Sequence, residues 1–427
     1  MAILDDLKTL VECESPTEDL VACEKVATIA TEIAKKVINS NAKVIKENGR
    51  PVFWLGSETP EIVLLAHLDT VWPVGSFTPT WRTEGDIVYG PGTFDMKAGF
   101  LQGLYALKDI NLENVALIAT TDEEVGSQTS RGLIEKLSSK ASAVLVLESS
   151  INGKVKTRRK GTAMYRILVN GKAAHAGLEP EKGINATVEI SNQIAKIASL
   201  ENRELGTTVV PTTLISGTTT NTVPANAILD IDVRSFSKSE LERIDKEIKS
   251  LKQTLQGATI AITGGINRPP LEKESTTKLF EKAKVVAERI GIADLQAAIV
   301  GGASDGNFAG IHTEVLDGLG AGIAHGGAQA ARELAEGDLE LPVERRAAVL
   351  LEGALGYQHL RAHRHLCRSF CLRRGRASEK APCCEGRADR NDQRPHQQHQ
   401  LPLVHATCPA LLTQARMSRA KWLKIVI

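Results

Sequence analysis

The residues with the clearest chemical meaning are His67 and Asp69, which directly follow an apolar run at residues 62–66. This run has the length and composition of a buried strand in a parallel sheet. Binding and catalytic sites in open parallel sheets form at the carboxyl ends of the strands. A histidine followed two residues later by a carboxylate can be a metal ligand whose ring the acid orients. Alone, such a pair more often belongs to an ordinary loop.

Carboxylates also end two further apolar runs, at residues 115–119 and 143–147, and a Gly/Pro turn at residues 89–94. In chain order these acids are Asp95, Asp122, Glu123, Glu124 and Glu148. Adjacent parallel strands would bring them together at one edge of the sheet. Clustered carboxylates repel one another and cost desolvation energy unless a cation neutralises them. The pattern therefore predicts a site for a divalent metal.

The neighbouring sequence predicts a sheet covered by helices, which such a site needs. Residues 3–40 carry apolar side chains at helical spacing, and residues 43–58 are typical of one or two short strands. Another helix is expected to begin just after Asp95, so that the positive end of its dipole lies beside this carboxylate. The fold class is therefore α/β, with a mostly parallel sheet.

A second domain is expected within the first. From about residue 160 the strands alternate between apolar and polar residues, and the order of elements is βαββαβ. This order is typical of a ferredoxin-like α+β unit with a mostly antiparallel sheet. Strand and helix patterns of the first kind resume after Pro270. The predicted segments are a catalytic domain at 1–160 and 269–355, an inserted lid and dimerisation domain at 161–268, and a tail at 356–427.

Composition limits the choice of partners and compartment. The 427 residues carry a formal net charge of +1, so no nucleic-acid or membrane partner is expected. No apolar stretch approaches the roughly 20 residues of a membrane span. The first residues lack the pattern of a secretory signal, and the body of the chain has only two cysteines, Cys13 and Cys23. We therefore expect a cytoplasmic protein without disulfides.

The tail at residues 356–427 has a different character. It holds 14 of the 52 Lys and Arg residues, 4 of the 51 Asp and Glu residues, five of the seven cysteines and six of the ten histidines. The cysteine and histidine spacings match no common zinc module, and aromatic residues are few for a nucleic-acid surface. We predict that this basic tail is disordered. Nucleic-acid contact, metal binding and a shifted reading frame are the alternatives.

Together, these motifs resemble a known enzyme family. The motifs, in order, are His67-Leu68-Asp69, Gly90-Pro91-Gly92, Asp95-Met96-Lys97, Asp122-Glu123-Glu124-Val125-Gly126, Glu148, Ala174-His175-Ala176-Gly177 and a glycine-rich segment at His325. This arrangement resembles the co-catalytic zinc family of aminoacylases, deacetylases, desuccinylases and glutamate carboxypeptidases over roughly residues 1–355. The folate-hydrolysing glutamate carboxypeptidases look most similar, because of the spacing from His175 to Asn221 to Arg234 and the segment around Arg268.

The resemblance implies two zinc ions per chain, which Co²⁺ or Mn²⁺ can replace. The implied ligands are Asp95 as the bridge, His67 and Glu148 at one ion, and Glu124 and His325 at the other. Asp69 would orient His67, and Glu123 would be the general base that accepts a proton from the attacking water. The resemblance also implies a non-proline cis peptide between Asp95 and Met96.

The segment around His325 departs from the family pattern. Two glycines and Gln329 follow His325, and a glutamate appears only at Glu333. In a shifted register Gln329 would take the ligand's place, and His312 is a further candidate. Without a histidine ligand the second zinc would be weakly held.

The inserted domain would supply the substrate contacts and a homodimer interface. His175 would stabilise the tetrahedral oxyanion across that interface. Arg234, Arg268 and Asn221 would hold a free carboxylate of the substrate, with Ser304 as a further contact.

These roles predict a metallopeptidase of the carboxypeptidase type. It would cleave an amide next to a free carboxylate in an N-acyl amino acid or peptide, and would release a C-terminal glutamate or a similar amino acid. The alternative within this class is an N-acyl-amino-acid deacylase or a dipeptidase. A non-catalytic binder of amino acids or peptides is the alternative outside it. The presence of Glu123 favours catalysis, because a binder has no need of a base.

Overall fold

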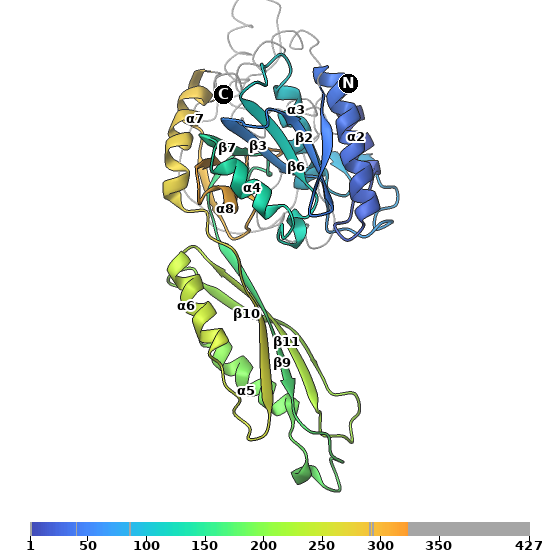
Figure 1. The fold of residues 1–427 in the computed structure, drawn as a ribbon, viewed down its shortest axis with the longest axis vertical. Helices are drawn as coiled ribbons and strands as arrows, with labels where there is room; N and C mark the ends of the chain where they lie inside the picture. The colour runs from blue at the N-terminus through green and yellow to red at the C-terminus, as the bar shows by residue number, and fades with distance from the viewer. Residues whose placement is uncertain (1, 40, 85–86, 290–291, 293, 323–427) are drawn as a thin grey trace, which may run out of the picture.

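The computed structural model describes residues 2–39, 41–84, 87–289, 292 and 294–322. The predictions for His325 and for the tail at 356–427 lie outside these residues. Figure 1 shows an α/β domain from which an elongated α+β domain projects. No helix among the described residues has the length and apolar character needed to cross a bilayer.

The α/β domain is built on a six-stranded sheet in the order β1-β2-β6-β3-β7-β14. The strands are β1 (Lys43–Glu47), β2 (Arg50–Gly56), β3 (Ile62–His67), β6 (Val115–Thr120), β7 (Ala143–Val146) and β14 (Glu314–Leu316). Strand β3 pairs in parallel with both β6 and β7, and β14 pairs in parallel with β7. Strands β1 and β2 add an antiparallel edge. The predicted mostly parallel sheet is confirmed, and the three strands expected to carry the site are neighbours.

Helices cover both faces of this sheet because β3 buries alternate side chains on opposite sides. Leu64 packs in a core with α1 (Ala2–Glu12), α2 (Leu20–Ile38), α3 (Ala98–Ala106) and α7 (Thr277–Arg289). Leu65 packs in a second core with α4 (Arg131–Ser138) and α8 (Gly306–Ala309). Two small sheets complete the domain, formed by β4 (Arg82–Glu84) with β5 (Ile87–Tyr89), and by β8 (Val155–Arg159) with β13 (Ala297–Val300).

The projecting domain has the predicted ferredoxin-like order. Its elements are β9 (Gly161–Asn170), α5 (Ala186–Ala198), β10 (Thr208–Ser216), β11 (Asn226–Ser235), α6 (Lys238–Lys249) and β12 (Thr259–Arg268). The strands form one antiparallel sheet in the order β10-β11-β9-β12, and both helices pack against it.

Helix α6 ends at Lys249, and residues 250–255 that follow it are not helical. The buried Glu189 carboxylate accepts hydrogen bonds from the backbone N–H groups of Thr254 and Leu255, which holds this segment outside the helix. Strand β12 continues through two glycines and ends at Arg268.

The projecting domain joins the α/β domain at one end only. At that end Thr162 of β9 pairs with Arg268 of β12, and at the other end Asn170 pairs with Thr259. The loops beyond Asn170 therefore lie at the tip farthest from the α/β domain (Figure 1). His175 and Asn221 belong to these loops, where the N–H of Ala176 donates to the backbone oxygen of Asn221 at 2.9 Å.

Candidate active site

Three of the predicted metal ligands meet at the carboxyl edge of the sheet. His67 ends β3, Glu148 follows β7, and Asp95 lies in the turn that precedes α3. One ligand atom from each lies within 4.8 Å of the other two. The Nε2 atom of His67 is 3.2 Å from Asp95 Oδ1 and 3.8 Å from Glu148 Oε1. One imidazole and two carboxylates form a donor set that suits zinc, and their closeness is the arrangement that a cation would stabilise.

Asp69 lies behind His67 and is fully buried. Its Oδ1 atom is 3.4 Å from Nδ1 of His67, while Oδ2 accepts a hydrogen bond from the Thr17 hydroxyl at 2.8 Å. The same carboxylate accepts the backbone N–H groups of Glu123 and Glu124 at 3.3 and 3.2 Å. Asp69 thus orients the imidazole and also holds the turn that carries the two glutamates.

Glu123 and Glu124 lie in a single 3₁₀ turn after β6. Gly126 closes the turn with a φ of +93°, and a Cβ there would lie 2.9 Å from the side chain of Asn267, so glycine is required at this position. Glu124 does not belong to the three-residue cluster, yet it lies close enough for the charge of Asp95 to affect its pKa. The carboxylate of Asp122 accepts hydrogen bonds from Thr129 and Ser130, so it is engaged in the loop that follows the turn.

Burial and crowding shift the pKa values of these groups. Burial raises the pKa of Glu123 to about 8, although the charge of Arg268 opposes the shift. Burial and the charge of Asp95 raise the pKa of Glu124 to about 9. For His67, burial favours the neutral ring, but hydrogen bonds to Asp69 and Asp95 raise the pKa well above 6.5. Without a cation, this site therefore favours the protonated forms of all three groups.

We expect the chelator-treated protein to lose stability between pH 5 and pH 8. Each raised pKa stabilises the folded state below the unfolded value, 4.5 for Glu123 and Glu124 and 6.5 for His67, and that contribution disappears as pH rises through the folded value. The lowered pKa values of Asp69 and Asp95 start from 3.8 and act below this window. Thermal unfolding at each pH measures the effect.

Zinc provides the control for this experiment. Metal ligands must be deprotonated, so the stabilisation by added zinc should increase from pH 5 to pH 8. A chelator-treated protein whose unfolding temperature rises over this range would contradict the assignment of a carboxylate cluster.

Glu148 has basic partners that the sequence did not reveal as part of the site. The Nη2 atom of Arg159 lies 3.3 Å from its carboxylate and Nζ of Lys156 lies 3.7 Å away. Asp317 holds Arg159 in turn through two hydrogen bonds of 2.7 and 3.0 Å. The available signal was the basic run at residues 154–160, which follows Glu148 closely.

The turn that carries Asp95 is fixed by Lys97. This lysine is fully buried, and its ammonium group donates to the backbone oxygens of Leu10 and Cys13 at 3.0 and 3.1 Å, near the end of α1. Burial lowers its pKa to about 8. The predicted cis peptide between Asp95 and Met96 is present.

The predicted substrate contacts do not converge in this structure. Ser304 is buried and donates to Asp317 at 2.8 Å, and Arg268 is buried against Glu123. Arg234 is half-buried near the base of β11 and pairs with Asp232. His175 and Asn221 lie at the far tip of the inserted domain. His312, the rival metal ligand, is exposed and does not belong to the cluster of described ligands.

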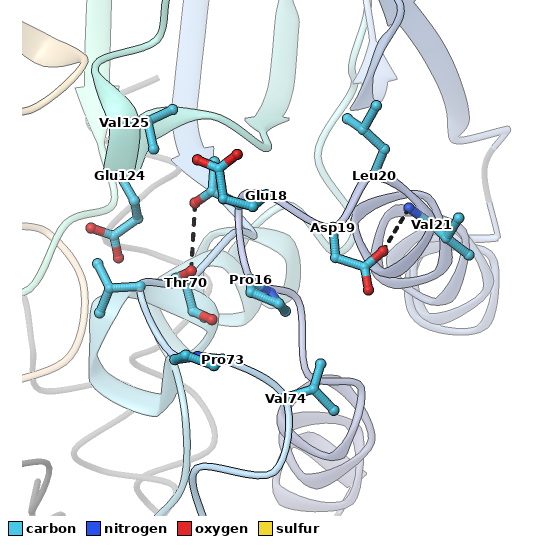
Figure 2. Close-up of a pocket in the computed structure, with 12 residues that line it drawn as sticks. Pro16, Glu18, Asp19, Leu20, Val21, Thr70, Pro73, Val74, Glu124 and Val125 are labelled. Carbon is cyan, nitrogen blue, oxygen red and sulfur yellow. Dashed lines mark hydrogen bonds between the residues drawn. The ribbon is translucent and has the colours of Figure 1, made fainter.

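A pocket of about 720 Å³ opens beside Glu124. Most of it is formed by residues 16–21, which include the first residues of α2, and by the loop at residues 70–74 (Figure 2). Its wall includes four exposed valines, Val21, Val71, Val74 and Val125. Exposed apolar side chains gathered in a concave surface next to polar groups are typical of a ligand site.

Comparison with known proteins agrees with this geometry. The chain matches Peptidase family M20/M25/M40 over residues 63–347. It is 30% identical over 272 residues to carboxypeptidase G2 of Pseudomonas sp. (strain RS-16), which covers 61% of this chain and 66% of that protein. It is 23% identical over 322 residues to a probable succinyl-diaminopimelate desuccinylase of Staphylococcus aureus (strain MRSA252), covering 64% and 78% of the two chains.

Solved structures share the fold. Aminopeptidase PepT of Bacillus cereus superposes with a TM-score of 0.62 at 22% identity, over 83% of this chain and 97% of that one. The M20 family metallo-carboxypeptidase Sso-CP2 of Sulfolobus solfataricus gives a TM-score of 0.64 at 15% identity, over 82% and 97%. This protein belongs to Peptidase family M20/M25/M40, a family of metallohydrolases, and the resemblance seen in its motifs is confirmed.

Proposed function

We propose that this protein is a zinc-dependent hydrolase that cleaves an amide bond next to a free carboxylate and releases a C-terminal glutamate or a similar amino acid. The observation that carries the proposal is the position of Glu123, a buried carboxylate outside the ligand cluster and on the turn that Asp69 holds. The similarity to carboxypeptidase G2 supports cleavage next to a C-terminal carboxylate.

The chemistry divides between metal and protein. His67, Asp95 and Glu148 would hold one zinc ion, and Asp95, Glu124 and His325 the other. When bound, two zinc ions would polarise the scissile carbonyl and lower the pKa of a water molecule toward neutral pH. Glu123 would accept a proton from the attacking water at a carboxylate oxygen and pass it to the nitrogen of the leaving amine.

The substrate class is tested with a panel of compounds. The purified full-length chain, with zinc added, should release glutamate from p-aminobenzoyl-glutamate faster than it hydrolyses N-acetyl amino acids or dipeptides without glutamate. Faster turnover of the latter compounds would favour a deacylase or dipeptidase. Binding without turnover of any compound would favour the non-catalytic alternative.

We assign the pocket beside Glu124 to the acyl side of the substrate. Replacing Val74 by aspartate should raise KM for p-aminobenzoyl-glutamate about tenfold and leave KM for N-acetyl-glutamate nearly unchanged. The reason is that the aryl group is large enough to cover the valine side chains of the pocket, whereas the acetyl group is not. Steady-state kinetics on both substrates measure the difference.

Val188 on α5 offers a matched control, since it is an exposed valine of the inserted domain. Val188→Asp should change neither KM. An equal rise in KM for both substrates in Val74→Asp would show that the aryl group lies elsewhere.

A homodimer is part of the proposal, and the position of the tip of the inserted domain supports it. His175 and Asn221 lie far from the metal cluster of their own chain, so they would act in the site of a partner chain. Mixing Glu123→Gln with His175→Ala, each nearly inactive alone, should then restore part of the activity, because mixed dimers would contain one intact site. No recovery after subunits have exchanged would count against a shared site.

A cytoplasmic location remains part of the proposal. Cys13 and Cys23 are buried free thiols, which supports a reducing compartment.

A further inference from the structure

Arg268 occupies the junction between the two domains. It is the last residue of β12, the strand by which the chain returns from the inserted domain. Its side chain points into the α/β domain and only 7% of the residue is exposed. A buried guanidinium needs anionic or carbonyl partners, and the partners present identify its role.

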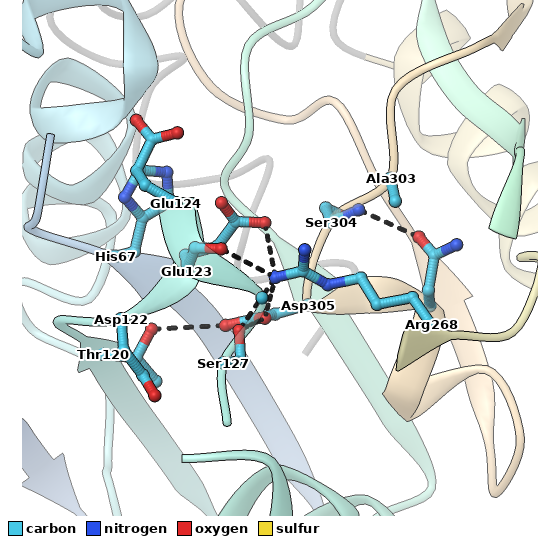
Figure 3. A network of polar contacts seen from close by, with 12 residues as sticks. His67, Thr120, Asp122, Glu123, Glu124, Ser127, Arg268, Ala303, Ser304 and Asp305 are labelled. Atoms are coloured by element: carbon cyan, nitrogen blue, oxygen red, sulfur yellow. Dashed lines mark hydrogen bonds and ion pairs between the residues drawn. The ribbon is translucent and has the colours of Figure 1, made fainter. Parts of the chain in front are cut away.

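The partners of Arg268 belong mainly to the turn that carries Glu123 (Figure 3). Its Nη2 atom lies 3.0 Å from Oε1 of Glu123 and donates to the backbone oxygen of the same residue at 2.9 Å. It also contacts the Ser127 hydroxyl at 2.8 Å and Oδ1 of Asp305 at 3.1 Å. One nitrogen thus lies among four acceptors, two of them provided by Glu123.

Asp305 is itself held in place. It precedes α8, and its carboxylate accepts hydrogen bonds from the Ser127 hydroxyl and from the Thr120 hydroxyl, the latter at 3.2 Å. The guanidinium therefore bridges a fixed carboxylate, Asp305, and the carboxylate of Glu123.

A second contact ties the same strand end to the same turn. Asn267, the neighbour of Arg268 in β12, donates from Nδ2 to the backbone oxygen of Gly126 at 3.0 Å. Two consecutive residues of the inserted domain thus fix both ends of the short turn that begins with Glu123. The hydrogen bonds of Arg268 are charge-assisted, and bonds of this kind set orientation as well as distance.

We propose that Arg268 is a positioning residue for Glu123. Its Nη2 atom is surrounded by the four acceptors described above, and its Nε atom is buried without a hydrogen-bond partner. By aligning the base, Arg268 also links the placement of the inserted domain to the proton transfer. The inference rests on the proposed role of Glu123.

The test separates kcat from KM. Arg268→Ala should lower kcat for p-aminobenzoyl-glutamate by about 10²-fold with KM changed less than about threefold, because misplacing a catalytic group costs roughly this much. Arg268→Lys should keep part of kcat, since it preserves the charge but offers a single donor centre. Added guanidinium ion should restore kcat in Arg268→Ala, which a general loss of structure would prevent.

Arg166→Ala is the matched control, because Arg166 is an exposed arginine of the inserted domain paired with Asp230. It should keep kcat and KM and show no response to guanidinium. A tenfold or larger rise in KM with unchanged kcat in Arg268→Lys would overturn the inference and assign Arg268 to the substrate. Should Arg268→Ala fail to fold, the Lys variant decides. An inactive wild-type protein would instead refute the proposed function.

Discussion

Replacement of Glu123 by glutamine should lower kcat by about 10²–10⁴-fold while zinc content and substrate affinity stay near the wild-type values. The amide has nearly the same size as the carboxylate and can still accept a hydrogen bond from Arg268, so the turn is preserved. It cannot accept a proton, however, and both water activation and protonation of the leaving amine depend on that transfer. Glutamate release, metal analysis and equilibrium binding measure the three quantities.

Glu135→Gln is the control for this variant, because Glu135 is a partly exposed residue on α4 that pairs with Arg131. It should retain full activity. Wild-type turnover in Glu123→Gln would show that another group moves the proton. If the wild-type protein and Glu123→Gln bind substrate equally well and neither turns it over, the alternative of a non-catalytic binder would be supported.

Removal of the central carboxylate should abolish the metal site. Asp95→Ala is expected to lose tight binding of both zinc ions and essentially all activity, since this carboxylate lies 3.2 Å from His67 and would be shared by the two ions. Asp69→Asn should have a smaller effect, about 10–100-fold in zinc affinity or activity, because Asp69 acts through His67 and the Glu123 turn. Zinc per chain after dialysis, measured by elemental analysis, gives the order of the two effects.

Asp109→Asn provides a neutral comparison, because Asp109 is exposed and has a left-handed backbone (φ 66°) that asparagine tolerates. A fully metallated Asp95→Ala protein would contradict the ligand assignment. So would an Asp69→Asn variant that binds zinc less well than Asp95→Ala.

The positions of the candidate ligands could be predicted from sequence for a physical reason. A strand buried on both faces appears as a continuous apolar run, and its last residue marks the edge where the neighbouring strands also end. His67, Glu123 and Glu148 were located in this way, and the structure places them at the ends of three adjacent strands.

The partners of these residues could not be predicted in the same way. Asp305 meets Ser127 across 178 positions of sequence, and Asp317 meets Arg159 across 158. No local pattern encodes such contacts, because they arise only when distant segments of the α/β domain pack together. For the same reason the sequence did not indicate that the side chains of Ser304 and Arg268, for which substrate contacts were predicted, are hydrogen-bonded within the protein.

The position of the inserted domain relative to the ligand cluster could not be predicted from the sequence either. Its βαββαβ order was evident from alternation and turn residues, and the sheet has the expected antiparallel pairing. The spacing of His175 and Asn221 gave no indication of how far they lie from the cluster, which depends on the direction in which β9 leaves the α/β domain (Figure 1).

The most direct test of the account is glutamate release from p-aminobenzoyl-glutamate by the purified full-length chain, measured with added zinc and again after treatment with a chelator. We expect release that the chelator abolishes and that zinc restores. Release that persists without metal would contradict the proposed mechanism. An absence of release from this compound, together with hydrolysis of N-acetyl amino acids or dipeptides, would keep the metal centre and move the substrate assignment to the deacylases or dipeptidases.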